Sequence, residues 1–145
     1  MPIKSFRGKL ADGSQETIVL HTNTGSTGYR IKKFQVMAID SSQDIESTMK
    51  IYKISQSTIN DDVDFSDNTL LAAAIISQSA SSSKYKFHNS IIFDNEVFNQ
   101  DIYVTLGGAD YNASLNYHIE LEQVKLDLNE NTVATLKDIR NIASQ

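Results

Sequence analysis

The sequence predicts an all-β fold, a single antiparallel β-sandwich domain over residues 1–145, jelly-roll-like, with about eight strands and a short C-terminal helix. Three observations predict it. Short apolar and β-branched stretches recur at intervals of roughly 10 to 15 residues, and Gly, Asn, Asp and Ser fill the connections between them. No linker, change of composition or internal repeat divides the chain. This profile is typical of a sandwich or jelly roll.

Five strands are predicted in the first half of the chain, over residues 3–10, 17–21, 29–40, 48–54 and 70–77. Asp12-Gly13 predicts a hairpin turn between the first two, and residues 22–28, 41–47 and 55–68 read as loops. Residues 29–40 become apolar on both faces, with Met37 and Ile39 opposite Val36, so we expect this end to be buried on both sides. Residues 70–77 are interpreted as a strand because an isolated helix that short would be marginal.

The second half predicts strands over residues 85–91, 101–106 and 115–121, a short edge contact at Val97-Phe98 and a turn over residues 107–110. The last strand has the clearest pattern, since Leu115, Tyr117, Ile119 and Leu121 alternate with polar residues. The alternation then continues on the opposite parity, at Val124, Leu126 and Leu128. This switch predicts a β-bulge or bend near Glu122 and Gln123.

The C-terminal segment changes to a spacing of three, which predicts an amphipathic helix over about 131–142 with an apolar stripe of Val133, Leu136, Ile139 and Ile142. Asn129 or Asn131 supplies the N-cap. The helix either caps its own sandwich, which we favour, or docks on a neighbouring protein. Deletion of residues 131–145 separates the two, because an insoluble product supports the cap and a folded product that no longer joins particles supports the dock.

Composition excludes several classes of function. The formal net charge is −5, which argues against nucleic acid as a partner because no basic surplus is available to displace counterions from phosphate. The absence of cysteine excludes disulfides, cysteine-ligated zinc and thiol catalysis. No stretch reaches the ~20 apolar residues of a membrane span, and no export signal is visible, so we expect a soluble protein without a membrane partner.

The acidic stretch from Asp61 to Asp67 is the most suggestive local cluster for a metal. Asp62, Asp64 and Ser66 have the alternate spacing of a calcium loop, but Asp67 and Ala73 occupy the positions where an EF-hand needs Gly and Glu. We interpret the stretch as a solvated turn with aspartate caps, and a looser calcium site stays open. No metal or cofactor is expected.

No residues are assigned a catalytic role, so we do not expect an enzyme. The three histidines, His21, His88 and His118, lie far apart in predicted strands, with His118 beside Glu120 on a polar face. Glu120 and Glu122 share that face as a carboxylate pair, but nothing marks either for a raised pKa. The tyrosines are expected in the core or on sheet surfaces, and would form a sugar-stacking platform only if several shared one face. These are Tyr29, Tyr52, Tyr85, Tyr103, Tyr111 and Tyr117.

Five phrases together carry a family resemblance: SFRGKLADG (5–13), TIVLHTNTG (17–25), VDFSDNTLLAA (63–73), FNQDIYVT (98–105) and NYHIELEQVKLDLNENTVATLKDIRN (116–141). They resemble a group of small proteins of marine tailed bacteriophages, which bring no catalytic motif. The resemblance implies a virion structural protein, most plausibly an accessory capsid protein that decorates or cements the shell. The implied partner is the major capsid protein, on which a homo-oligomer (dimer or trimer) sits in the virion after assembly in the host cytoplasm.

Three other functions are weighed against this one. The main alternative is a carbohydrate- or receptor-binding module of a tail or fibre, which predicts glycan affinity that is lost when a loop tyrosine such as Tyr111 is replaced. A host-interaction protein outside the virion comes third, and a cryptic enzyme last. Capsid versus tail location, strand order and the loops or edges of any interface cannot be read from the residues.

Overall fold

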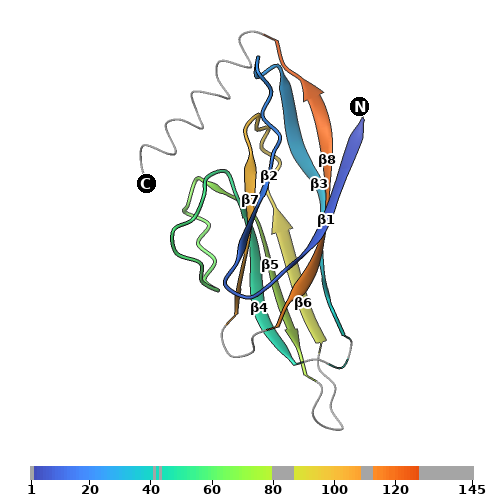
Figure 1. Cartoon of the computed structure of the whole chain (residues 1–145), viewed down its shortest axis with the longest axis vertical. Helices are drawn as coiled ribbons and strands as arrows, with labels where there is room; N and C mark the ends of the chain where they lie inside the picture. Colours follow the sequence, from blue (N-terminus) through green and yellow to red (C-terminus); the bar gives the residue numbers. More distant parts are fainter. Residues whose placement is uncertain (1, 41, 43, 80–86, 109–112, 128–145) are drawn as a thin grey trace.

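The chain folds into two antiparallel sheets packed face to face, as the computed structural model in Figure 1 shows; it describes residues 2–40, 42, 44–79, 87–108 and 113–127. The described residues form eight strands, in agreement with the predicted all-β sandwich. These are β1 (Ile3–Leu10), β2 (Gln15–Ile18), β3 (Thr27–Ala38), β4 (Ile45–Tyr52), β5 (Leu70–Gln78), β6 (Phe87–Phe93), β7 (Ile102–Gly108) and β8 (Leu115–Lys125).

The strand order is that of a jelly roll with one altered pairing. The three-stranded sheet has the order β1-β8-β3 and the five-stranded sheet the order β2-β7-β4-β5-β6. The first strand therefore pairs with the last, the second with the seventh and the fourth with the fifth, as expected when one long antiparallel hairpin is rolled up. The third and sixth strands would be partners in the same scheme, but β6 hydrogen-bonds to β5 instead and lies near β3 across the sandwich.

The core is built from alternate residues of the two sheets. On β8, Leu115, Tyr117, Ile119 and Leu121 are all buried, which confirms the predicted alternation. On the facing sheet, β4 contributes residues such as Met49 that are fully buried. Each such side chain contributes about 1.5–3 kcal/mol relative to an exposed one, so this interface holds the two layers together.

Strand β3 differs from its prediction in two ways. Met37 is 72% exposed and Ile39 is 46% exposed, so the expected burial on both faces is wrong. β3 is an edge strand, and no described residue covers the outer face of its sheet. The register irregularity lies on β3 between Ile31 and Lys33, opposite β8, rather than on β8 near Glu122.

The turn at Asp12-Gly13 does not form the predicted hairpin. Gly13 has φ 77°, which the turn requires, but the chain then passes from one sheet to the other. The backbone N–H of Gly13 donates to the carbonyl of Leu106 (2.7 Å), and Leu106 N–H donates to the carbonyl of Ser14 (3.1 Å). The turn is thus held against β7, so β2 pairs with β7 while β1 pairs with β8.

Other boundaries differ from the predicted ones for local reasons. β2 ends at Ile18 because the carboxylate of Asp101 accepts the N–H groups of Leu20 and His21 at 2.9 and 3.0 Å, in place of a ladder partner. β4 begins at Ile45, inside the predicted loop, and β7 includes Gly107 and Gly108, which were predicted as a turn.

The remaining predictions divide into those confirmed and those untested. β5 is a strand, as expected, and the predicted edge contact at Phe98 is an isolated bridge to Tyr29. The predicted helix over about 131–142 lies outside the described residues. The part of the chain that the structure describes contains no helix long and apolar enough to cross a membrane.

The connection over residues 53–69, of which residues 55–68 were predicted as a loop, covers part of the outer face of the five-stranded sheet. Ser55 and the backbone of Gln56 hydrogen-bond to Gln15 on β2 (3.0 and 2.8 Å). The backbone of Asn60 lies against Gly107 on β7, where an added Cβ would be 2.3 Å from its carbonyl oxygen. We call this connection the cover loop. It forms a third layer over β2, β7 and β4.

Candidate functional site on the outer face of the three-stranded sheet

Six side chains form two adjacent rows across the outer face of the three-stranded sheet. The register places Arg7 beside His118 and His118 beside Gln35. One step along the strands it places Lys9 beside Asn116 and Asn116 beside Met37. Residues two apart on a strand share a face, so both rows point away from the core. We call these six residues the basic face.

The basic face borders a groove of about 1050 Å³. The groove follows β3 over residues 35–39 and continues to β5 and β6, where Ile76 and Ile91 contribute apolar surface. It lies where a third–sixth strand pair would have closed the sandwich, so the altered pairing of β6 leaves this side of the molecule open.

The cations of the basic face are not neutralised. Arg7 and Lys9 are exposed and make no ion pair or hydrogen bond with another described residue. The amide side chains of Gln35 and Asn116 likewise have no partner among the described residues. These four polar side chains all bear N–H donors, and paired strands hold them in fixed positions, so they suit an anionic or acidic ligand.

The carboxylates of the same sheet are already paired. Glu122 accepts from Arg30 Nη2 and Nε at 2.6 and 3.0 Å, and Lys32 Nζ lies 4.0 Å away. The hydrogen bond from Arg30 lowers the pKa of Glu122 below its usual value. A glycosidase acid needs a raised pKa, so Glu122 does not fit that role. Glu120 lies 3.9 Å from Lys33 and 4.0 Å from His118.

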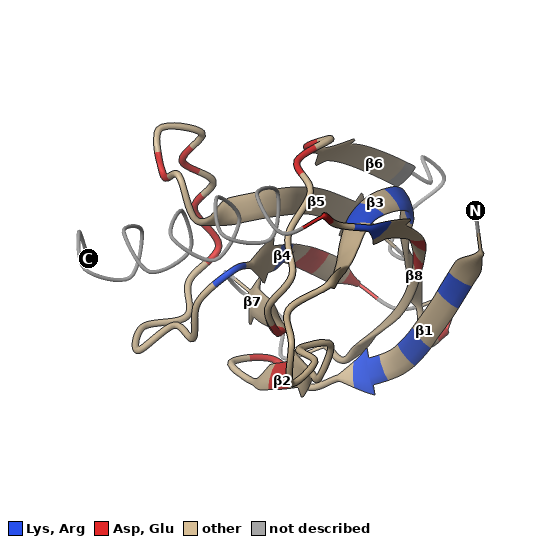
Figure 2. Cartoon of the chain, turned by 90° about the horizontal axis from the view of Figure 1, so that it is seen from above, with Lys and Arg blue, Asp and Glu red and all other residues tan. Residues whose placement is uncertain are grey.

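Basic side chains gather on the three-stranded sheet, as the blue segments of β1 and β3 in Figure 2 show. Of the nine Lys and Arg among the described residues, seven lie on β1, β3 and β8, and the other two, Lys50 and Lys53, are buried on the opposite side. Of the fifteen described Asp and Glu, only Glu120 and Glu122 belong to the three-stranded sheet. One side of the molecule is therefore basic and the remainder acidic.

The predicted calcium stretch forms aspartate-capped turns. Asp64 accepts from the backbone and hydroxyl of Ser66 at 3.0 and 2.6 Å, and Asp67 accepts from the backbone and hydroxyl of Thr69 at 2.9 and 2.6 Å. The bonds from Ser66 lower the pKa of Asp64. Within the described ranges no three His, Cys, Asp or Glu side chains gather closely enough to hold a metal ion.

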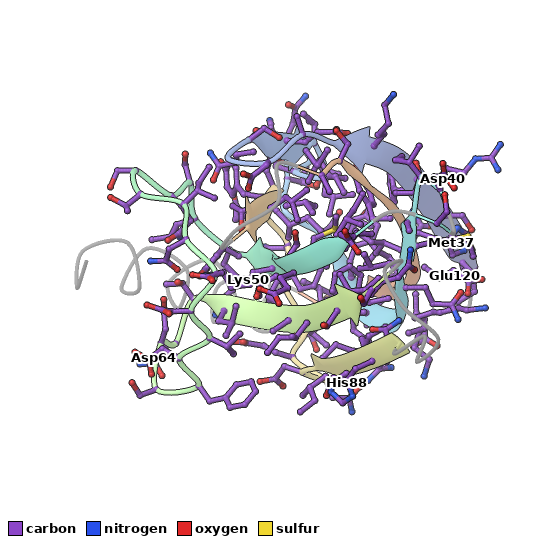
Figure 3. All side chains as sticks on the ribbon, turned by 90° about the horizontal axis from the view of Figure 1, so that it is seen from below. Met37, Asp40, Lys50, Asp64, His88 and Glu120 are labelled. Atoms are coloured by element: carbon purple, nitrogen blue, oxygen red, sulfur yellow. The ribbon has the colours of Figure 1, made fainter. Side chains whose placement is uncertain are left out.

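The three histidines occupy different settings. His21 lies after β2 rather than in a strand, and its Nδ1 is 2.7 Å from Asp101 Oδ1. His88 is exposed on β6 (Figure 3). His118, on the polar face as predicted, belongs to the basic face.

The described tyrosines do not form a stacking platform. Tyr29, Tyr52 and Tyr117 are buried and Tyr103 is half-buried, while Tyr85 and Tyr111 lie outside the described residues. The Tyr117 hydroxyl donates to Glu16 Oε1 at 2.6 Å, and burial together with this carboxylate raises the pKa of Tyr117. Tyr29 and Tyr117 belong to the core between the sheets.

A second candidate surface lies on β5 and β6. Ile75 is 43% exposed, Ile92 55% and Phe93 39%. A hollow of about 520 Å³ opens beside Ile92 and Phe93, with Phe65 of the cover loop on its wall. Ile75 and Ile92 share the outer face, and we call these two residues the β6 apolar patch, whereas Phe93, the next residue along β6, faces the other way.

Sequence reasoning places two residues of the basic face in their correct setting, Asn116 and His118, on the polar face of their strand. The pattern does not mark Arg7 or Lys9, and it assigns Met37 to the core. β1, β3 and β8 each contribute two residues that are spaced two apart and point outward. The order of the strands is needed to know that residues 7–9, 35–37 and 116–118 lie together.

Comparison with known proteins leaves the function open. No family model matches the chain, and no curated protein matches it in sequence. A solved structure described as "Bacillus endospore appendages form a novel family of disulfide-linked pili" matches 87% of this chain and 88% of its own, with a TM-score of 0.44 and 6% sequence identity. A likeness at this level assigns no function.

Proposed function

We propose that the protein is an accessory structural protein of a virion that decorates or cements the outer shell of a capsid. The family resemblance of the sequence phrases motivates this role, and the β6 apolar patch supports it. The proposed partner is the major capsid protein, and the proposed location is the assembled virion.

The single observation that carries the proposal is the β6 apolar patch beside an unpaired strand edge. β6 is the last strand of its sheet, so one side of its backbone has no ladder partner among the described residues. Ala73 pairs with Ile92 and Ile75 pairs with Ser90, which makes Ile75 and Ile92 diagonal neighbours on the outer face. Exposed apolar residues next to a free edge mark a site for protein association.

The first test is the number of copies per virion. A shell decoration protein is expected at a copy number comparable with that of the major capsid protein, measured by quantitative mass spectrometry of purified particles. A handful of copies per particle would sink the capsid role.

The second test uses matched variants in a particle-binding assay. Ile92→Asp is expected to abolish binding to shells, because it places a charge in the β6 apolar patch. Val19→Asp is the control, since Val19 is 66% exposed and lies in the connection after β2, away from the patch. Equal binding by wild type and Ile92→Asp would contradict the proposed contact.

The carbohydrate- or receptor-binding alternative has one observation in its favour, which is the unpartnered amides of Gln35 and Asn116 beside Arg7 in the groove. It predicts binding to host surface glycans that Asn116→Ala removes and Ile92→Asp leaves intact. Silence across host polysaccharides would count against it.

A further inference from the structure

We propose that the basic face binds the acidic tip of the cover loop in a second copy of the same chain, so that copies join head to tail. The acidic tip consists of Asp61, Asp62, Asp64, Phe65 and Asp67. This contact goes beyond the proposed capsid role, and it is a property of the purified protein.

The acidic tip has the composition of a ligand for the basic face. Asp61, Asp62 and Asp64 are exposed, and the carboxylates of Asp61 and Asp62 contact no described cation. Phe65 is 69% exposed at the centre of these charges. An aromatic anchor surrounded by carboxylates is suited to a groove that offers cations around an apolar strip.

The tip is presented on a fixed support rather than on a free loop. Lys50 Nζ, itself buried, donates to Asn60 Oδ1 at 3.0 Å and to the carbonyl of Asp62 at 2.6 Å. The hydroxyl of Thr48 donates to the carbonyl of Asp61 at 2.9 Å. Because Asp61 and Asp62 are held through their backbone carbonyls, their carboxylates stay available to a partner. A pre-ordered tip loses less conformational entropy on binding.

The groove supplies the complementary chemistry. Arg7 and Lys9 are exposed cations without partners among the described residues, and they line the groove together with Met37 and Ile39, which are 72% and 46% exposed. Cations therefore meet the carboxylates of the tip, and the apolar strip of β3 meets Phe65. The volume of about 1050 Å³ accommodates an aromatic side chain with its neighbours.

The two surfaces lie on opposite sides of the molecule. In Figures 1 and 2 the cover loop and β1, β8 and β3 occupy opposite sides of the sandwich, and Figure 3 places Asp64 opposite Met37 and Glu120. Two copies cannot satisfy both contacts with each other, so the contact is heterologous and repeats from copy to copy. The expected product is a growing chain of copies rather than a closed pair.

The test is sedimentation of the purified full-length chain with two charge-reversed variants. In the first, Arg7→Glu and Lys9→Glu make the basic face acidic. In the second, Asp61→Lys and Asp62→Lys make the acidic tip basic, without removing the turn bonds of Asp64 and Asp67. Wild type is expected to increase in mean mass with concentration, without a plateau at the dimer, and the association should weaken by about tenfold or more when salt screens the charges.

Each variant alone is expected to remain monomeric, because its face and its tip then carry the same sign. An equimolar mixture of the two is expected to associate again. Each contact between the two different variants joins an acidic surface to a basic one. Lys4→Glu with Lys125→Glu is the control, as it changes the same sheet by the same charge outside the groove lining. The control should associate as wild type does.

Several outcomes would overturn the proposal. They are a wild type that stays monomeric at low salt up to about millimolar concentration, a plateau at the dimer, variants that associate unchanged, a mixture that does not recover, and a control that loses association equally. Phe65→Ser provides a second measurement, with an expected loss of association in a folded protein of unchanged net charge. Copy number in virions is measured separately, so failure here does not decide the capsid role.

Discussion

Lysine side chains are exposed on the outer face of the three-stranded sheet and buried on the outer face of the five-stranded sheet. On the three-stranded sheet, Lys32 and Lys33 are exposed beside Glu122 and Glu120 at 4.0 and 3.9 Å. On the five-stranded sheet, Lys50 is 3% exposed beneath the cover loop, and its ammonium group is bonded to oxygens of Asn60 and Asp62 and lies 5.5 Å from the ring centre of Tyr52.

The difference shows that the alternation of a strand does not reveal whether its polar side is exposed to solvent or covered by a loop. In sequence, His118 on β8 and Lys50 on β4 both occupy the polar side of an alternating strand. The first face is open to partners, whereas the second is covered over β2, β7 and β4 by a connection that Lys50 holds in place. The following substitutions break or sharpen this contrast, from the largest expected effect to the smallest.

Gly107→Ala is expected to destabilise the protein the most, by about 3 kcal/mol or more. Its Cβ would lie 2.3 Å from the backbone oxygen of Asn60, so the cover loop must move as a whole. Gly8→Ala on the three-stranded sheet is the comparison, since its Cβ would meet mainly the end of the Tyr117 side chain at 2.9 Å. We expect about 1 kcal/mol there. Urea unfolding measures both, and equal losses would show that the cover loop yields easily.

Lys50→Met is expected to cost about 2–3 kcal/mol, because it removes two charge-assisted hydrogen bonds from a buried ammonium group to the cover loop. It should also speed proteolysis within residues 53–69, since the clamp on the loop is lost. Lys33→Met, at a 46% exposed side chain, is the control and should change stability by less than about 0.5 kcal/mol. A similar effect of the two substitutions would remove the contrast between the faces.

Thr105→Val and Thr48→Val are expected to shift stability by about 1 kcal/mol in opposite directions. Both threonines are buried on the covered side. The hydroxyl of Thr105 has no hydrogen-bond partner among the described residues, so a methyl group should stabilise the fold. The hydroxyl of Thr48 donates to the carbonyl of Asp61 in the cover loop at 2.9 Å, and loss of this hydrogen bond should destabilise the fold. Thermal unfolding of the pair decides, and two shifts of the same sign would contradict this assignment.

The smallest effect is expected from the pH dependence of the contact at Asp101. Burial raises the pKa of this carboxyl, but hydrogen bonds from His21 and Leu20 outweigh it, and the pKa is lowered on balance. A lowered folded-state pKa contributes stability above the unfolded value of about 4, and this contribution is lost as pH falls through the folded value. The difference in urea midpoint between wild type and Asp101→Asn should therefore narrow on acidification below about pH 4. A constant difference would show that the carboxylate charge is not involved.

The fold was largely predictable because it rests on period-two patterns that single strands display. Leu115, Tyr117, Ile119 and Leu121 needed no partner strand to be recognised. The burial of Lys50 was not predictable. Thr48, Lys50 and Tyr52 have the parity of a solvent face, and they become interior only because the cover loop, which follows β4 directly, folds back over it. The basic face was missed for a related reason, as its members meet only when β8 lies between β1 and β3.

The central position of β8 has a consequence for how the chain is made. β1 and β3 have no hydrogen bonds to each other within their sheet and are joined only through β8, whose first residue is Leu115. A ribosome that has translated the first 114 residues has released both flanking strands but not the strand between them. At about 5–20 residues per second, β1 waits several seconds for its partner. Non-local pairing of this kind folds slowly, so we expect β1 and β3 to stay unpaired with each other until β8 is made. Among the described strands, β8 leaves the ribosome last, and it is the strand that brings the basic face together.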